Sequence, residues 1–205
     1  MKKDPAKGKA KPLMDNKKYG SELFYDCFDS PLGPLWLVAG KAGLSYLIRG
    51  KKEDVFLAEI LRRTGLKPTK KLNQMSRWRS PLFRYFSGET ITFDGPISFL
   101  EGTPFQQKVW QTLLKIPYGS VRSYQWVGDR LGMKRAGRAI GNACGKNPIP
   151  VIIPCHRVVR QDGTLGGYTG GTSIKEKLLA LEGVSPKKGL FSSHFLGNGE
   201  SNETA

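Results

Sequence analysis

Residues 123–146 carry the pattern that decides the fold of the second half of the chain: SYQWVGDRLGMKRAGRAIGNACGK. Serine is a favoured N-cap residue and glycine is common just after the end of a helix, so Ser123 and Gly132 mark the two ends of a first predicted helix. A second predicted helix, basic and rich in small residues, covers residues 134–146. Two short helices about one turn apart are typical of a helix-turn-helix, although helical hairpins that never touch DNA share this spacing. Both interpretations stay open on this pattern alone.

The second predicted helix has an unusual composition. Gly137, Ala139 and Gly141 are small, and Arg135 and Arg138 add positive charge around them. Such a face suits close approach to a flat anionic surface, whereas the alternative is close packing against another helix. We treat these five residues as candidate DNA contacts.

A reactive segment, NPIPVIIPCHRVV, follows at residues 147–159. Its residues 151–153 are predicted to form a short buried strand that ends at the next proline. Cys155 then stands beside His156 and Arg157, and basic or cationic neighbours favour the thiolate form of cysteine. Cys155 is therefore a candidate nucleophile, with a bridging water linking it to His156. The alternative is a buried structural cysteine.

A carboxylate lies at the end of the last predicted helix, which begins at Ser173 and stops at Gly183. Glu182 there faces the negative end of the helix dipole, which is unfavourable without a cationic or imidazole partner. His156 is the candidate partner, and a solvated glutamate is the alternative.

The first half of the chain is predicted to contain strands as well as helices. An antiparallel meander of three strands is predicted, followed by a helix, an irregular basic stretch, a helical turn and one more strand. These elements cover residues 23–28, 35–39, 44–48, 55–63, 65–80, 82–86 and 91–99. Another helix, capped by Thr103 with Pro104 in its first turn, opens the second half.

The fold class predicted is α+β, with a small antiparallel sheet plus helix followed by a mostly helical domain. We expect a disordered basic leader at residues 1–20, an α+β domain at 21–101, a second domain at 102–190 that carries the candidate DNA contacts and the candidate nucleophile, and a flexible tail at 191–205.

Charge is the strongest bulk signal, with a net +16 over 205 residues. Residues 101–190 hold fourteen basic and five acidic side chains, a net of +9. This excess favours an anionic partner, nucleic acid first, although a solubilising surface is the alternative. No apolar stretch is long enough to span a bilayer and no secretory signal is present, so we expect a cytoplasmic protein, or a nuclear one in a eukaryote. Three cysteines cannot form a closed disulfide set, and two histidines, His156 and His194, give no zinc-type spacing.

Residues 102–183 resemble the O6-alkylguanine-DNA alkyltransferases (methylated-DNA–protein-cysteine methyltransferases). The similarity rests on ordered motifs: Thr103-Pro104-Phe105-Gln106, Ser123-Tyr124-Gln125, Arg138-Ala139-Ile140-Gly141, Asn147-Pro148, Pro154-Cys155-His156-Arg157-Val158 and Tyr168-Thr169-Gly170-Gly171. The resemblance implies a monomeric, single-use repair protein without a cofactor or metal. Its substrate would be double-stranded DNA containing O6-alkylguanine, and also O4-alkylthymine, with no membrane partner.

The resemblance also implies roles for individual residues. Cys155 would accept the alkyl group, His156 would act through a water as base, and Glu182 would orient His156. Asn147 would brace the turn that presents the cysteine, and Tyr124 would donate a hydrogen bond to the departing base.

The DNA-facing roles implied by the resemblance are separate. Arg138 would enter the stack in place of the extruded nucleotide, with the small residues of its helix in the minor groove. Val158, Tyr168 and Thr169 would line the guanine pocket, and Thr169 stands where the family often has serine. Two rival functions remain: a DNA-binding module with a structural Cys155, and a cysteine hydrolase built on Cys155, His156 and Glu182.

Overall fold

A computed structural model describes residues 22–186 and 189–191, and the predicted leader and most of the predicted tail lie outside these residues. The chain begins with β1 (Leu23–Ser30), β2 (Gly33–Gly40) and β3 (Gly43–Arg49), which confirms the predicted meander. A short β4 (Thr69–Lys70), absent from the prediction, pairs in parallel with β1 to give the sheet order β3-β2-β1-β4.

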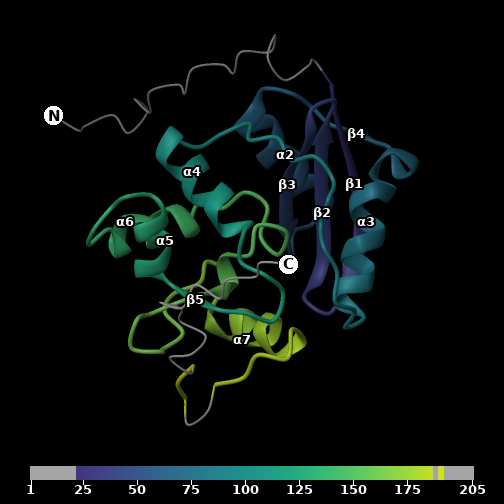
Figure 1. Cartoon of the computed structure of the whole chain (residues 1–205). Helices are drawn as coiled ribbons and strands as arrows, with labels where there is room; N and C mark the ends of the chain where they lie inside the picture. The colour runs from purple at the N-terminus through teal and green to yellow at the C-terminus, as the bar shows by residue number, and fades with distance from the viewer. Residues whose placement is uncertain (1–21, 187–188, 192–205) are drawn as a thin grey trace, which may run out of the picture.

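Each face of this sheet is covered by different elements (Figure 1). One face packs on α2 (Glu53–Thr64), where Phe56 and Ile60 meet Trp36 and Val38 of β2. The alternate residues of β2 point the other way, into a larger cluster that includes α3 (Leu72–Phe86). This alternation follows from the two-residue period of a strand.

The prediction was wrong for residues 65–80, most of which belong to α3 or β4. Four α3 side chains at helical spacing are buried: Met75, Trp78, Leu82 and Tyr85. The basic residues between them obscured this period in the sequence. The predicted strand at residues 91–99 is also wrong, because only a single bridge forms, between Leu44 and Ile97.

The second half is mostly helical, as predicted. It contains α4 (Pro104–Leu113), α5 (Tyr124–Arg130), α6 (Gly137–Cys144) and α7 (Thr172–Leu181). Thr103 and Gln106 cap α4 reciprocally, which confirms the predicted start of that helix. The helix predicted from residue 134 begins only at Gly137, because Arg135 has a φ of 58° and lies in the preceding turn.

The prediction of a strand at residues 151–153 is wrong. Val151 has a φ of 76°, and the segment forms a turn closed by a bridge between Pro150 and Ile153. The following 3-10 helix η1 (Cys155–Arg157) leads into β6 (Val158–Val159). β6 pairs in parallel with β5 (Arg122–Ser123), an element that the sequence did not predict.

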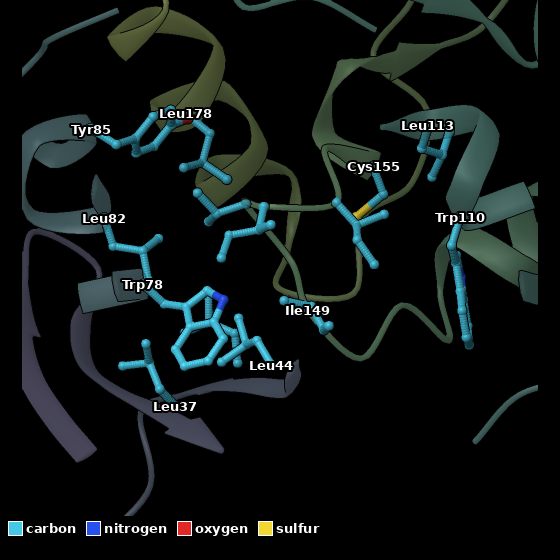
Figure 2. Close-up of a cluster of buried hydrophobic side chains, with 14 of the residues drawn as sticks. Leu37, Leu44, Trp78, Leu82, Tyr85, Trp110, Leu113, Ile149, Cys155 and Leu178 are labelled. Atoms are coloured by element: carbon cyan, nitrogen blue, oxygen red, sulfur yellow. The ribbon is translucent and has the colours of Figure 1, made fainter. Parts of the chain in front are cut away.

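One buried cluster joins the two halves of the chain (Figure 2). Leu37 and Leu44 of the sheet, Trp110 and Leu113 of α4, and Cys155 all belong to it. The cysteine therefore stands at the edge of a core to which both halves contribute.

Candidate active site

Cys155 is the first residue of η1, and only 6% of its surface is exposed. Its Sγ accepts a hydrogen bond from Nδ2 of Asn147, with 3.1 Å between the two atoms. Burial raises the pKa of the Cys155 thiol, while the Asn147 hydrogen bond and the charge of Lys175 act in the opposite direction. The resting side chain is therefore a thiol that needs a base to become nucleophilic.

Asn147 also holds the turn that precedes the cysteine. Its Nδ2 donates to the carbonyl of Ile153 at 2.8 Å, and its Oδ1 accepts from the amide of Ile149 at 2.9 Å. These bonds bracket Val151, a β-branched residue in the left-handed region, which is a strained conformation. The side chain of Asn147 thus ties the turn and the sulfur together.

His156 and Glu182 meet as a fully buried pair. Nε2 of His156 lies 2.8 Å from Oε1 of Glu182, and neither side chain is exposed. The partner expected for the carboxylate at the end of α7 is thus present, and the alternative of a solvated glutamate is wrong.

Glu182 has three further partners. Arg157 donates from Nε to Oε2 at 2.8 Å and from Nη2 to Oε1 at 3.0 Å. The hydroxyl of Tyr85 donates to Oε1 at 2.7 Å, and the amide of Gly119 donates to Oε2 at 3.2 Å. Burial alone would raise the pKa of Glu182, but the hydrogen bonds from His156 and Arg157 lower it to about 2. Glu182 is therefore a carboxylate at neutral pH.

This carboxylate fixes the tautomer of His156. An ionised carboxylate only accepts hydrogen bonds, so Nε2 of His156 carries the proton and Nδ1 carries the lone pair. Burial lowers the pKa of His156, which keeps the ring neutral. Among the described residues, no protein group makes a hydrogen bond to the buried Nδ1.

A cavity of about 360 Å³ borders the sulfur of Cys155. Its walls come from α5, α6, η1 and the loop before α7, namely Tyr124, Gly141, Cys144, Gly145, Cys155, Gly167, Tyr168 and Thr169. This volume falls within the range of small-molecule sites, roughly 300–1,000 Å³. The predicted pocket residues Tyr168 and Thr169 are among these residues, whereas Val158 is fully buried in β6 and is not.

Tyr124 begins α5 directly after β5, whose pairing with β6 brings it beside the segment of Cys155. Burial, with a smaller contribution from Cys144 and Cys155, raises the pKa of Tyr124 to about 12. The phenol therefore keeps its proton at neutral pH and can donate a hydrogen bond into the cavity.

The candidate DNA contacts divide into two groups. Arg135, Arg138 and Ala139 are exposed. A Cβ on Gly137 or Gly141 would instead lie 3.8 or 3.7 Å from the Tyr124 side chain. Both distances are ordinary van der Waals contacts, so packing against α5 leaves room for a methyl group and does not require glycine at either position.

The sequence analysis did not assign three buried residues to the site: Tyr85 and Arg157, which bind Glu182, and Lys175. Lys175 lies on α7, and its Nζ donates to the carbonyls of Val158 and Leu165. Burial lowers the pKa of Lys175 to about 8. The sequence signal that could have pointed to it is its position one helical turn before Leu178 and Leu179, on the apolar side of the predicted helix.

Two absences hold for residues 22–186 and 189–191. They contain no group of three or more histidine, cysteine, aspartate or glutamate side chains arranged to hold a metal ion. Nor do they include a helix with the length and apolar character needed to cross a membrane.

Comparisons with known proteins identify the family. Residues 104–184 match the family model described as 6-O-methylguanine DNA methyltransferase, DNA binding domain. A methylated-DNA–protein-cysteine methyltransferase of Methanosarcina barkeri is 41% identical over 78% of this chain and 97% of that protein. The constitutive enzyme of that name from Bacillus subtilis is 39% identical over 80% of this chain and 98% of its own length.

Solved structures give the same result. The crystal structure of Mycobacterium tuberculosis OGT in complex with DNA superposes with a TM-score of 0.67 and 40% identity, over 78% of this chain and 93% of that one. The crystal structure of Mycobacterium tuberculosis O6-methylguanine methyltransferase superposes with a TM-score of 0.67 and 39% identity, over 80% of this chain and 95% of that one. The chain belongs to the methylated-DNA–protein-cysteine methyltransferase family.

Proposed function

We propose that this chain repairs DNA by transferring the alkyl group of O6-alkylguanine, once and irreversibly, to its own Cys155. The observation that carries the proposal is the sulfur of Cys155 at the wall of a cavity that it shares with the phenol of Tyr124. The names of the curated relatives, which specify a cysteine as methyl acceptor, support the same chemistry. O4-alkylthymine carries the same alkyl–oxygen–ring unit and is a second substrate, and the protein acts as a monomer without a cofactor.

His156 serves as the base that activates the thiol. Its Nδ1 has the free lone pair, because Glu182 holds the proton on Nε2. A bridging water carries the proton from Sγ of Cys155 to this nitrogen, and the carboxylate of Glu182 stabilises the imidazolium that results.

The transfer itself is a displacement at the alkyl carbon. The sulfur electron pair attacks this carbon in line with its bond to O6, so that an S–C bond forms and the C–O6 bond breaks. The electron pair of the broken bond stays on guanine, and the hydroxyl of Tyr124 donates to the departing base. Overall, the thiol proton replaces the alkyl group on guanine, and the thioether left on Cys155 has no easy route back.

The damaged nucleotide must leave the double helix to reach the cavity. The exposed residues Arg135, Arg138 and Ala139 support approach of α6 to the minor groove, with Arg138 replacing the extruded base in the stack. Extrusion costs a few kcal/mol. The net charge of +9 over residues 101–190 offsets this cost through contacts with phosphates.

A labelled-methyl assay tests the proposal. Duplex DNA with one tritiated O6-methylguanine should transfer its label to the wild-type protein and to Cys144→Ala, but not to Cys155→Ala. Cys144 is the matched control because its side chain borders the same cavity. Label transfer to Cys155→Ala, or several turnovers per chain, would overturn the proposal.

A further inference from the structure

A second cavity, of about 420 Å³, reaches Cys155 from the side of the sheet. Four residues border both cavities: Cys144, Cys155, Tyr168 and Thr169. An alkyl carbon positioned for attack by the sulfur therefore stands where the two cavities meet. The part of a long alkyl group beyond that carbon has the second cavity available to it.

The walls of the second cavity are mainly apolar. They include Leu35 of β2, Leu47 of β3, Pro150 before η1 and Ile174 of α7. A hydrocarbon chain that leaves water for these walls gains free energy roughly in proportion to the apolar area buried.

Three cations border this cavity, and two of them are neutralised. Lys51 and Arg63 each form an ion pair of 3.1 Å with Glu59, and Arg63 also pairs with Glu101. The remaining cation, Arg49, donates from Nη1 to the carbonyl of Leu32 at 3.3 Å. Within residues 22–186 and 189–191, no carboxylate forms an ion pair with it.

Arg49 is electrostatically coupled to the wall that the two cavities share. Burial raises the pKa of Tyr168, and the positive charge of Arg49 opposes that rise. The positive charge of Arg49 therefore reaches the ring of Tyr168, which borders both cavities. A chain that starts at the sulfur and continues into this cavity shares its walls with Arg49, an exposed cation that no carboxylate of the described residues pairs.

We propose that this second cavity is a subsite for O6-alkyl groups that carry a terminal carboxylate, and that Arg49 recognises the carboxylate. The proposal rests on the transfer to Cys155 proposed above and names a substrate class for it. The reacting bonds are unchanged: the S–C bond forms, the C–O6 bond breaks, and the carboxylate takes no part. Guanidinium and carboxylate form strong, charge-assisted hydrogen bonds, which a neutral group of the same size cannot match.

The test compares three duplex oligonucleotides that differ only at O6 of one guanine. The groups are methyl, carboxypropyl and the carboxamide of carboxypropyl, which matches the acid in size. Single-turnover transfer to the wild-type protein should be about ten-fold faster for the acid than for the amide at low salt, and the advantage should shrink as salt rises.

Two variants locate the effect. Arg49→Gln should abolish the preference for the acid while it leaves methyl transfer unchanged, and Arg77→Gln should keep the preference. Arg77 is an exposed arginine of α3 that does not border the cavity, so it controls for the loss of one positive charge. Equal rates for acid and amide in the wild type, or a preference that survives Arg49→Gln, would overturn the proposal. Loss of transfer from O6-methylguanine in the wild type would instead contradict the underlying function.

Discussion

The hydroxyl of Tyr85 donates a 2.7 Å hydrogen bond to Oε1 of Glu182, the same carboxylate oxygen that binds Nε2 of His156. Tyr85 belongs to α3, which covers the sheet of the first half, whereas His156 and Glu182 belong to the second half. The first half of the chain therefore supplies a direct partner of the His156–Glu182 pair. A donor on Oε1 withdraws electron density from the oxygen that polarises the imidazole, so Tyr85 limits how strongly Glu182 favours the charged form of His156.

Tyr85→Phe should move the acidic limb of methyl transfer to higher pH. Without this donor Glu182 binds the imidazolium more strongly, which raises the pKa of His156, and the neutral base is lost at a higher pH. The other charged groups that act on His156, Arg157 and Lys175, are unchanged. We expect transfer to slow on the acidic side of the profile and to change little on its alkaline side, as measured by single-turnover rates across the pH range in which the protein stays folded.

Tyr118→Phe is the matched control for this experiment. Its hydroxyl donates to the carbonyl of Leu181 at 3.0 Å, next to Glu182 but not to its carboxylate. Removing it should cost about 1 kcal/mol of stability without moving the pH profile. An equal shift in both variants would show that the effect of Tyr85 is only structural.

Asn147→Ala should weaken both the fold and the nucleophile. The change removes three hydrogen bonds, to Ile153, Ile149 and the sulfur of Cys155. We expect a loss of about 2 kcal/mol in urea unfolding. Because Asn147 lowers the pKa of Cys155 against the effect of burial, alkylation of the thiol by iodoacetamide should shift to higher pH. Cys27→Ser and Cys144→Ser in the same chain leave Cys155 as the remaining thiol for this titration. An unchanged thiol titration would show that Asn147 acts on the turn alone.

The stability of the protein should fall in acid through Glu182. Its pKa is about 2 in the folded chain, against an ordinary value of 4.5, so the unfolded chain binds a proton first as the pH falls. The stabilisation is complete above pH 4.5 and is lost between 4.5 and about 2, and it amounts to about 3 kcal/mol. Urea unfolding across this window should show the loss in the wild type and a flatter dependence in Glu182→Gln. At neutral pH this variant should be less stable, because Arg157 keeps a buried charge without its partner. Parallel curves for the two proteins would contradict this role of Glu182.

Arg138→Ala should impair repair of duplex DNA more than the reaction with the free base. Arg138 is exposed in the first turn of α6 and is not among the residues that line the cavity at Cys155, so its loss removes only the side chain that would replace the extruded nucleotide. We expect transfer from duplex O6-methylguanine to slow about ten-fold or more, while the slow reaction with free O6-methylguanine stays constant. Arg77→Ala, which removes an arginine from α3, should leave both rates unchanged. Equal slowing of the two substrates by Arg138→Ala would exclude a role in extrusion.

Local patterns predicted much of the fold. The meander of the first three strands, the Thr103 cap of α4 and the Ser123 cap of α5 were correctly predicted, because each depends on neighbours in sequence. Most of α3 was missed because its three arginines alternate with the four residues that it buries, which obscures the helical period; only its last turn, within residues 82–86, was predicted. The Val151 turn was also missed, because three β-branched residues in a row favour a strand unless side chains from elsewhere hold another conformation.

In the candidate site, too, local sequence signals predicted one contact, whereas a contact between distant residues was not predicted. The pairing of His156 with Glu182 followed from the position of a carboxylate at a helix C-terminus, which is a local rule. Tyr85 lies 97 residues before Glu182, and nothing near it in sequence marks its hydroxyl as a donor to that carboxylate. Its role exists only after α3 and α7 pack against the same core.

Intact-mass spectrometry with peptide mapping, after mixing the protein with excess duplex O6-methylguanine DNA, tests the central claim most directly. The account predicts a single mass increase of about 14 Da, located on the peptide that contains Cys155, with no second addition at longer times. An unchanged protein mass while the DNA loses its methyl groups, or a methyl group on Cys27 or Cys144, would contradict it.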